Sequence, residues 1–128
     1  MKRIVRPIPN WDDSTDAIFG MANLVPKRTG LKADIWSPHK GGAEKLPHNS
    51  TRVKITIGDS KVSITVEPNP KIKAASPNIK HSDMKAIEDA IDYVGRNYDL
   101  FLKHLNDVDD EFLDEDLFQA LRERGEYK

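Results

Sequence analysis

The chain has 128 residues, of which 38% are hydrophobic and 32% charged, with a formal net charge of −1 and no cysteine. This length suffices for one domain but not for two independent cores, and the apolar content excludes a disordered chain. The absence of cysteine excludes a disulfide scaffold, a thiolate nucleophile and a zinc site that depends on sulfur ligands.

Residues 1–16 hold prolines and an Asp-rich cluster with no apolar period, which predicts an N-terminal arm before a single domain over residues 17–128. Pro7, Pro9 and Asp12 interrupt the stretch that would follow the positive start of a signal peptide. The longest mostly apolar run, residues 17–25, is shorter than the roughly 20 residues that cross a bilayer. We therefore expect a cytoplasmic protein that makes no membrane contact.

Four strands are predicted next. Apolar segments at 18–24 and 31–36 flank a turn-rich link and predict an antiparallel pair. β-branched residues then alternate with polar ones at 52–57 and 62–67, which buries one side of the sheet and turns Arg52 and Lys54 towards water. Prolines at 68, 70 and 77 predict an irregular connection over residues 68–80.

A long helix is predicted after this connection, with Ser82 as its N-cap and a length of about 25 residues. Its apolar positions recur at steps of three and four, and Asp92 with Arg96 and Asp99 with Lys103 have the i,i+4 spacing of helical ion pairs. The apolar stripe consists of Met84, Ile87, Ile91, Val94, Tyr98, Phe101 and Leu105.

This stripe suits a helix lying on its own sheet better than a coiled-coil seam between two copies, so a monomer and a homodimer both stay open. A short helix is predicted over residues 116–124, with Gly125 as its stop. The expected class is α+β: an antiparallel sheet of about four strands packed against one long helix, with a short C-terminal helix.

The connection over residues 37–50 is the principal candidate for a working surface, because a loop of this length in a small domain is either functional or disordered. Cationic side chains there and on the following strand suit phosphate groups, although Trp36 is the single aromatic residue among them. The predicted binding residues are Trp36, His39, Lys40, Lys45, His48, Arg52 and Lys54.

A second reading of the same loop is catalytic. Two histidines beside a cation can cleave a phosphodiester, since one ring accepts a proton while the other donates one. His39, His48 and Arg52 would then carry the reaction without a metal.

The acidic run 107–116 competes with the loop as the working surface. Its carboxylates suit the positive end of a helix dipole, and His104 with Asp107 suits a solvated helix end. The alternative is a protein-binding patch in which Phe112 and Leu113 are apolar anchors ringed by negative charge. Neither a calcium-loop pattern nor a metal-ligand spacing is present, so we expect no metal and no cofactor.

Four segments together resemble a family of small uncharacterised bacterial proteins: Leu31–Trp36, the histidine-bearing loop, Thr51–Ile55, and the helix from Ser82 through the acidic tail. That family pairs a Pro-His-x-His stretch before a β-hairpin with one long C-terminal helix, and its members often lie near toxin–antitoxin or mobile-element genes. Over residues 18–121, Pro47 and His48 match the motif, whereas Ser50 stands where the family has its second histidine. The resemblance implies this fold and a bacterial cytoplasmic setting.

These observations predict a non-enzymatic interaction module of a bacterial or phage-associated system, of the toxin–antitoxin or defence kind. A protein is the first expected partner, and RNA is a second through the basic face. The alternative is a small metal-independent endoribonuclease of the toxin type.

Overall fold

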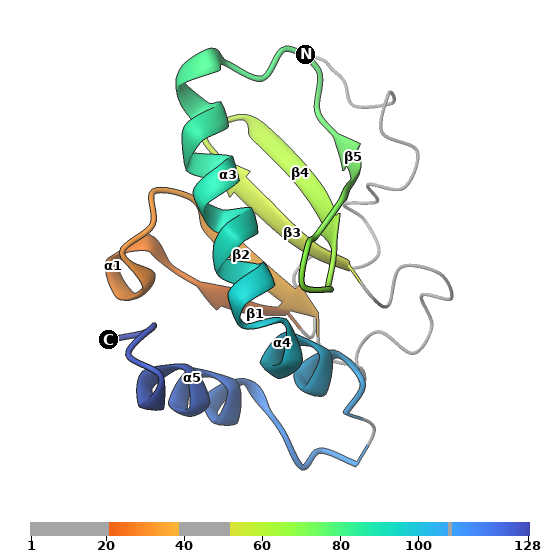
Figure 1. The fold of residues 1–128 in the computed structure, drawn as a ribbon, viewed down its shortest axis with the longest axis vertical. Coiled ribbons are helices and arrows are strands. Elements are labelled where there is room, and N and C mark those ends of the chain that lie inside the picture. Colours follow the sequence, from red (N-terminus) through yellow and green to blue (C-terminus); the bar gives the residue numbers. More distant parts are fainter. Residues whose placement is uncertain (1–20, 39–51, 108) are drawn as a thin grey trace.

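The computed structural model describes residues 21–38, 52–107 and 109–128, and these form an α+β fold as predicted. The sheet is an antiparallel meander with its strands side by side in chain order (Figure 1). Its strands are β1 (Met21–Leu24), β2 (Asp34–Pro38), β3 (Arg52–Ile57), β4 (Ser60–Thr65) and β5 (Ile72–Ala75). The helices are α1 (Pro26–Thr29), α3 (His81–Arg96), α4 (Tyr98–Leu105) and α5 (Asp114–Glu123).

The fifth strand corrects the prediction that residues 68–80 are irregular. β5 pairs with β4, where Val62 faces Ala75 and Ser63 faces Ala74. The three prolines lie outside residues 72–75, so none of them removes a donor from the ladder between the two strands. An edge strand this short needs few apolar residues, which is why its sequence carries little alternation.

The core lies between one face of the sheet and the helices that cross it (Figure 1). Ile35, Val53 and Ile64 of the strands and Ile87 and Phe101 of the helices have no exposed surface. The predicted helix-on-sheet packing is therefore confirmed. The buried stripe of α3 is displaced from the predicted one: its buried residues are Ala86, Ile87, Ala90, Tyr93 and Val94, whereas Met84, Ile91 and Tyr98 are half-buried.

The predicted single helix is two helices, because Asn97 interrupts it. The φ and ψ angles of Asn97 are −117° and 25°, outside the helical range. Its side-chain Nδ2 donates to the Tyr93 carbonyl at 3.0 Å, and its backbone N–H also donates there at 3.2 Å. The break is therefore hydrogen-bonded although Asn97 is buried. The helix begins at His81, so Ser82 is not its N-cap.

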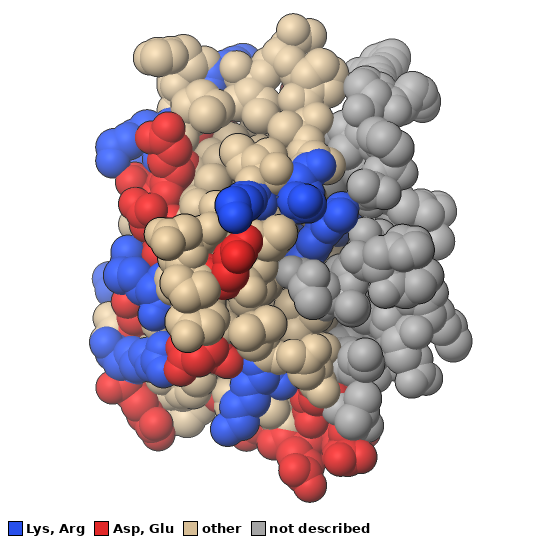
Figure 2. Space-filling view, turned by 45° about the vertical axis from the view of Figure 1, so that its right-hand side comes forward, with Lys and Arg blue, Asp and Glu red and all other residues tan. Residues whose placement is uncertain are grey.

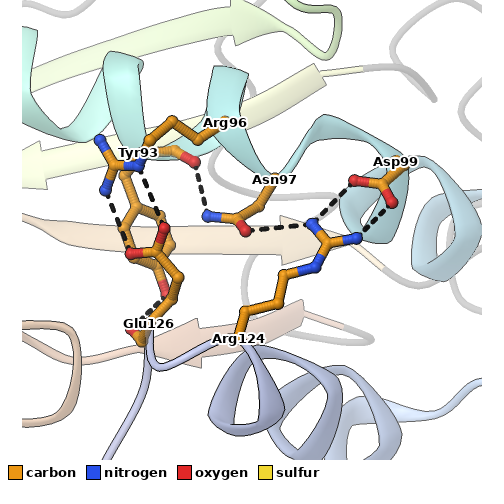
Figure 3. Close-up of polar contacts among 6 residues, drawn as sticks. All are labelled: Tyr93, Arg96, Asn97, Asp99, Arg124 and Glu126. Carbon is orange, nitrogen blue, oxygen red and sulfur yellow. Dashed lines mark hydrogen bonds and ion pairs between the residues drawn. The ribbon is translucent and has the colours of Figure 1, made fainter.

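The chain after α5 fastens onto this break through a cluster that we call the C-terminal clasp (Figure 3). The Arg124 guanidinium donates to both carboxylate oxygens of Asp99 and, at 3.2 Å, to Asn97 Oδ1. Arg96 donates to both carboxylate oxygens of Glu126, at 3.0 and 3.1 Å. Arg96 and Asp99 thus pair with residues distant in sequence, and the predicted i,i+4 pairs with Asp92 and Lys103 are wrong.

We expect Gly95→Ala to lower the free energy of unfolding by about 1–3 kcal/mol, as overpacked sites do. A Cβ at Gly95 would lie 2.6 Å from the Pro68 carbonyl oxygen, a backbone atom that cannot turn aside. Inside a helix without such a contact, replacing glycine by alanine raises the stability by about 1 kcal/mol. The sign of the change in the free energy of unfolding therefore shows whether the close contact exists. Urea denaturation measures it, with Glu88→Ala on the exposed side of α3 as the control. A stabilised Gly95→Ala variant would contradict the close approach.

The clasp makes the stability of the fold depend on pH in the acidic range. The Arg124 guanidinium lowers the pKa of Asp99, and the Arg96 guanidinium lowers the pKa of Glu126. A carboxylate whose pKa is lowered by folding stabilises the fold above its ordinary pKa, and this contribution disappears as the pH falls through the folded value. The melting temperature should therefore fall as the pH drops below the ordinary values of 3.8 and 4.5.

Thermal melts of the double variant Arg96→Gln, Arg124→Gln test this dependence. We expect a lower melting temperature at neutral pH and a smaller further loss in acid than in the parent chain. Lys71→Gln, which removes an exposed cation away from the clasp, serves as the control. An unchanged acid profile in the double variant would show that the clasp carboxylates do not set it.

Candidate binding face on the sheet

The two faces of the sheet differ in what covers them. α3 packs against β3 and β4, and α4 packs against β2, all on the apolar face. On the opposite face, which we call the open face because α3 and α4 do not lie on it, a row of facing residues crosses the strands: Asn23, Trp36, Lys54, the buried Ser63 and Ala74. Arg52 lies on this same face, because it precedes Lys54 by two residues on β3.

Three of the predicted binding residues, Trp36, Arg52 and Lys54, thus lie on neighbouring strands of one face. The others, His39, Lys40, Lys45 and His48, lie outside the described residues, as does the predicted arm 1–16. Whether the two histidines approach each other and Arg52 therefore stays a prediction.

The indole of Trp36 is held in place on the open face. Its Nε1 donates to Thr56 Oγ1 on β3 at 3.1 Å, and the side chain is half-buried. Because the single N–H of the ring is used within the sheet, any contact of Trp36 with a ligand is made by its carbon surface.

Two polar atoms beside Trp36 lack a counterpart. Asn23 Oδ1 and Arg52 Nη1 are buried and have no hydrogen-bond partner within the described ranges. The Asn23 side chain does bond Asp34, whose pKa is raised by burial and lowered to a smaller extent by that hydrogen bond. A buried polar atom without a partner costs about 1–3 kcal/mol of stability.

Cationic residues extend from the open face towards the β5 edge. Lys61 faces Thr56 across β3 and β4, and Lys71 and Lys73 lie at the start of β5 with exposed side chains. With the β5 side turned forward, Figure 2 shows Lys and Arg side chains gathered in the middle of the molecule, next to the undescribed residues. Along the left margin of the same view, basic and acidic side chains are mixed.

The structure also assembles a polar group that the sequence reading missed. His104 has no exposed surface, its Nδ1 lies 3.0 Å from Ser37 Oγ, and its Nε2 lies 2.8 Å from Asp114 Oδ1. The prediction of a solvated helix end at His104 is therefore wrong. The available signal was its position three residues after Phe101, on the buried side of the helix.

This Ser37–His104–Asp114 group has the residue types of a nucleophilic triad but not the access. Ser37 and His104 are both completely buried, so no substrate carbonyl can reach the serine oxygen. The group instead links β2, α4 and α5 through two hydrogen bonds, of which the one between Ser37 and His104 is buried and the one to the half-exposed Asp114 is partly buried. Its role in this fold is structural.

Two carboxylates of the acidic run 107–116 accept hydrogen bonds from backbone N–H groups close to them in sequence. The Asp107 carboxylate accepts from the backbone N–H groups of Glu111 and Phe112, and Asp116 accepts from that of Leu113 at the start of α5. Phe112 is buried, with Lys103 Nζ 4.7 Å from its ring centroid, so it is no exposed anchor. Helix capping thus accounts for Asp116 and a loop contact for Asp107, whereas Leu113, the second predicted anchor, is exposed.

No protein-family model, curated protein or solved structure matches this chain. The family resemblance accordingly stays a prediction. No helix within the described ranges has the length and apolar character to cross a membrane. In the same ranges, no three histidine or carboxylate side chains gather as metal ligands do.

A double-mutant cycle tests the structural role of His104. His104→Leu should lower the free energy of unfolding by about 2–4 kcal/mol, because it leaves the buried Ser37 hydroxyl without a partner. Adding Ser37→Ala should recover part of that loss, since both polar partners are then gone. Strictly additive losses in denaturant titrations would contradict the coupling between the two side chains.

Proposed function

We propose that this chain is a non-enzymatic interaction module that binds RNA through the open face of its sheet. The observation that carries the proposal is the placement of Trp36, Arg52 and Lys54 on adjacent strands of the face opposite α3 and α4. An antiparallel sheet with helices behind it and an aromatic residue in front is a common platform for unpaired RNA.

Charge supports RNA over an acidic protein as the first partner to test. Arg52, Lys54 and Lys61 lie on the neighbouring strands β3 and β4, and the cationic region continues to Lys71 and Lys73 at the edge. Guanidinium and ammonium groups along neighbouring strands suit a backbone that repeats one negative charge per nucleotide. An acidic protein would use the same cations but would not need the aromatic surface.

The setting proposed from the family resemblance is the cytoplasm of a bacterium, in a toxin–antitoxin, defence or mobile-element context. In such a setting an RNA-binding module acts by occupying its target rather than by cleaving it. The endoribonuclease alternative depends on His39 and His48 beside Arg52, and because both histidines lie outside the described residues it stays a prediction.

Binding to an unstructured RNA oligonucleotide should weaken steeply as salt rises, because cations on the open face release counterions from the phosphates. Replacing Arg52 and Lys54 by Gln should lower the affinity for every sequence alike and flatten the salt slope by about 0.7 per cation removed. Fluorescence anisotropy at several salt concentrations measures both effects.

The matched control replaces Lys80 and Lys85 by Gln, which removes the same charge at the helix side of the molecule. It should leave affinity and slope near the parent values. Equal losses in the two double variants would show that net charge, and not the open face, governs binding. If the parent chain binds no RNA at low salt but captures an acidic protein through Arg52 and Lys54, the partner is a protein.

A further inference from the structure

We infer that the basic N-terminal segment of this chain, residues 2–6, binds in a groove between α4 and the acidic run 107–116 of the same molecule. The segment lies outside the described residues and combines three cations with two apolar side chains: Lys2, Arg3, Ile4, Val5 and Arg6. The inference goes beyond the proposed function, because the groove is lined by α4 and the run after it and not by the open face.

The groove joins apolar and acidic side chains around a volume of about 560 Å³. The half-buried Leu102 of α4 and the buried Phe112 contribute its carbon surface. Lys103 is the single cation of the lining, and its Nζ lies 4.7 Å from the Phe112 ring centroid. Four further lining residues are acidic, which gives the groove a formal charge of −3: Asp99, Asp107, Asp109 and Glu111.

Two of these four carboxylates are used by the fold, and two are not. Asp99 pairs with Arg124, and Asp107 accepts from two backbone N–H groups. Asp109 and Glu111 are exposed, and their carboxylates make no hydrogen bond or ion pair within the described residues. In Figure 2, acidic side chains gather at the lower end of the molecule, where Figure 1 shows the connection between α4 and α5. A cation bound there would offset the repulsion between like charges.

The first described residue, Met21, ties the N-terminal segment to this end of the fold. Met21 faces Pro38 across β1 and β2, and the preceding residue of β2, Ser37, lies with its Oγ 3.0 Å from His104 Nδ1 on α4. Fourteen residues separate residue 6 from Met21, and an extended chain of that length spans up to about 46–50 Å. The radius of a domain this size is smaller, so the segment can reach the groove from Met21.

Charge and apolar content both match between the segment and the groove. Its three cations equal the formal charge of the lining, and Ile4 and Val5 offer carbon surface to Leu102 and Phe112. A basic segment of a partner protein would have the same chemistry. Covalent linkage, however, gives the chain's own segment an effective concentration on the order of millimolar, so it occupies the groove first.

A spin label on the segment tests the contact in the full chain. Because the chain has no cysteine, Pro7→Cys provides a single attachment point for a nitroxide. In NMR spectra, the nitroxide should remove most of the amide signal intensity of Leu102, Lys103 and Glu111 and leave that of Gly58, in the turn between β3 and β4, unchanged. The loss should decrease in about 1 M salt, where the Debye length is about 3 Å.

Charge variants show which groups make the contact. Reversing the groove with Asp109→Lys and Glu111→Lys should abolish the signal loss at Leu102. Changing the three cations of the segment to Glu in that variant should restore the loss, because the two signs are then exchanged. The matched control, Asp59→Lys with Glu88→Lys, makes the same change in net charge at exposed residues outside the groove and should retain the loss.

Three results would overturn the inference. One is an unchanged intensity of Leu102 and Lys103 at low salt, and another is a loss that survives the reversal of Asp109 and Glu111. The third is a loss seen only between labelled and unlabelled copies in a mixture, which would place the contact between two chains. If the label has no effect but a separate peptide rich in Lys and Arg shifts these signals, the occupant is a partner protein and the inference is equally refuted. RNA binding by the open face is measured separately and is unaffected by each result.

Discussion

The apolar face of the five-stranded antiparallel sheet has to be shielded from water by helices. The change of chain direction at Asn97 lets two helices, rather than one, pack across this face. α3 reaches β3 and β4, whereas α4 reaches β2, so one straight helix would leave part of the core uncovered. Asn97 ends the first helix and bonds its last carbonyl groups through both its backbone and its side chain. The remaining architecture depends on this change of direction.

The C-terminal clasp stabilises the break from the outside. Its ion pairs, Arg96 with Glu126 and Arg124 with Asp99, join residues of the acidic C-terminal half to one another. That half thus neutralises part of its own charge. Arg52 and Lys54 lie on the other side of the sheet from α3 and α4.

The two faces of the sheet differ in how their buried polar groups are hydrogen-bonded. On the helix side, the buried Ser37 and His104 and the half-exposed Asp114 form a continuous hydrogen-bonded group, and every member of it has a partner. On the open face, Asn23 and Arg52 each carry a buried atom without one among the described residues. Satisfied groups of this kind stabilise a fold, whereas a buried polar atom without a partner lowers its stability.

Local patterns in the sequence were sufficient for the α+β class, for the hairpin of β3 and β4, and for the placement of Arg52 and Lys54 opposite the core, because alternation and helical periodicity are properties of neighbouring residues. Local patterns did not predict the short edge strand β5 or the break at Asn97. The strand depends on pairing with β4, and the break depends on contacts with Tyr93 and Arg124. The same holds for His104, whose partners are 67 and 10 residues away in sequence. Only the tertiary structure decides such features, because their energies come from residues that the fold brings together.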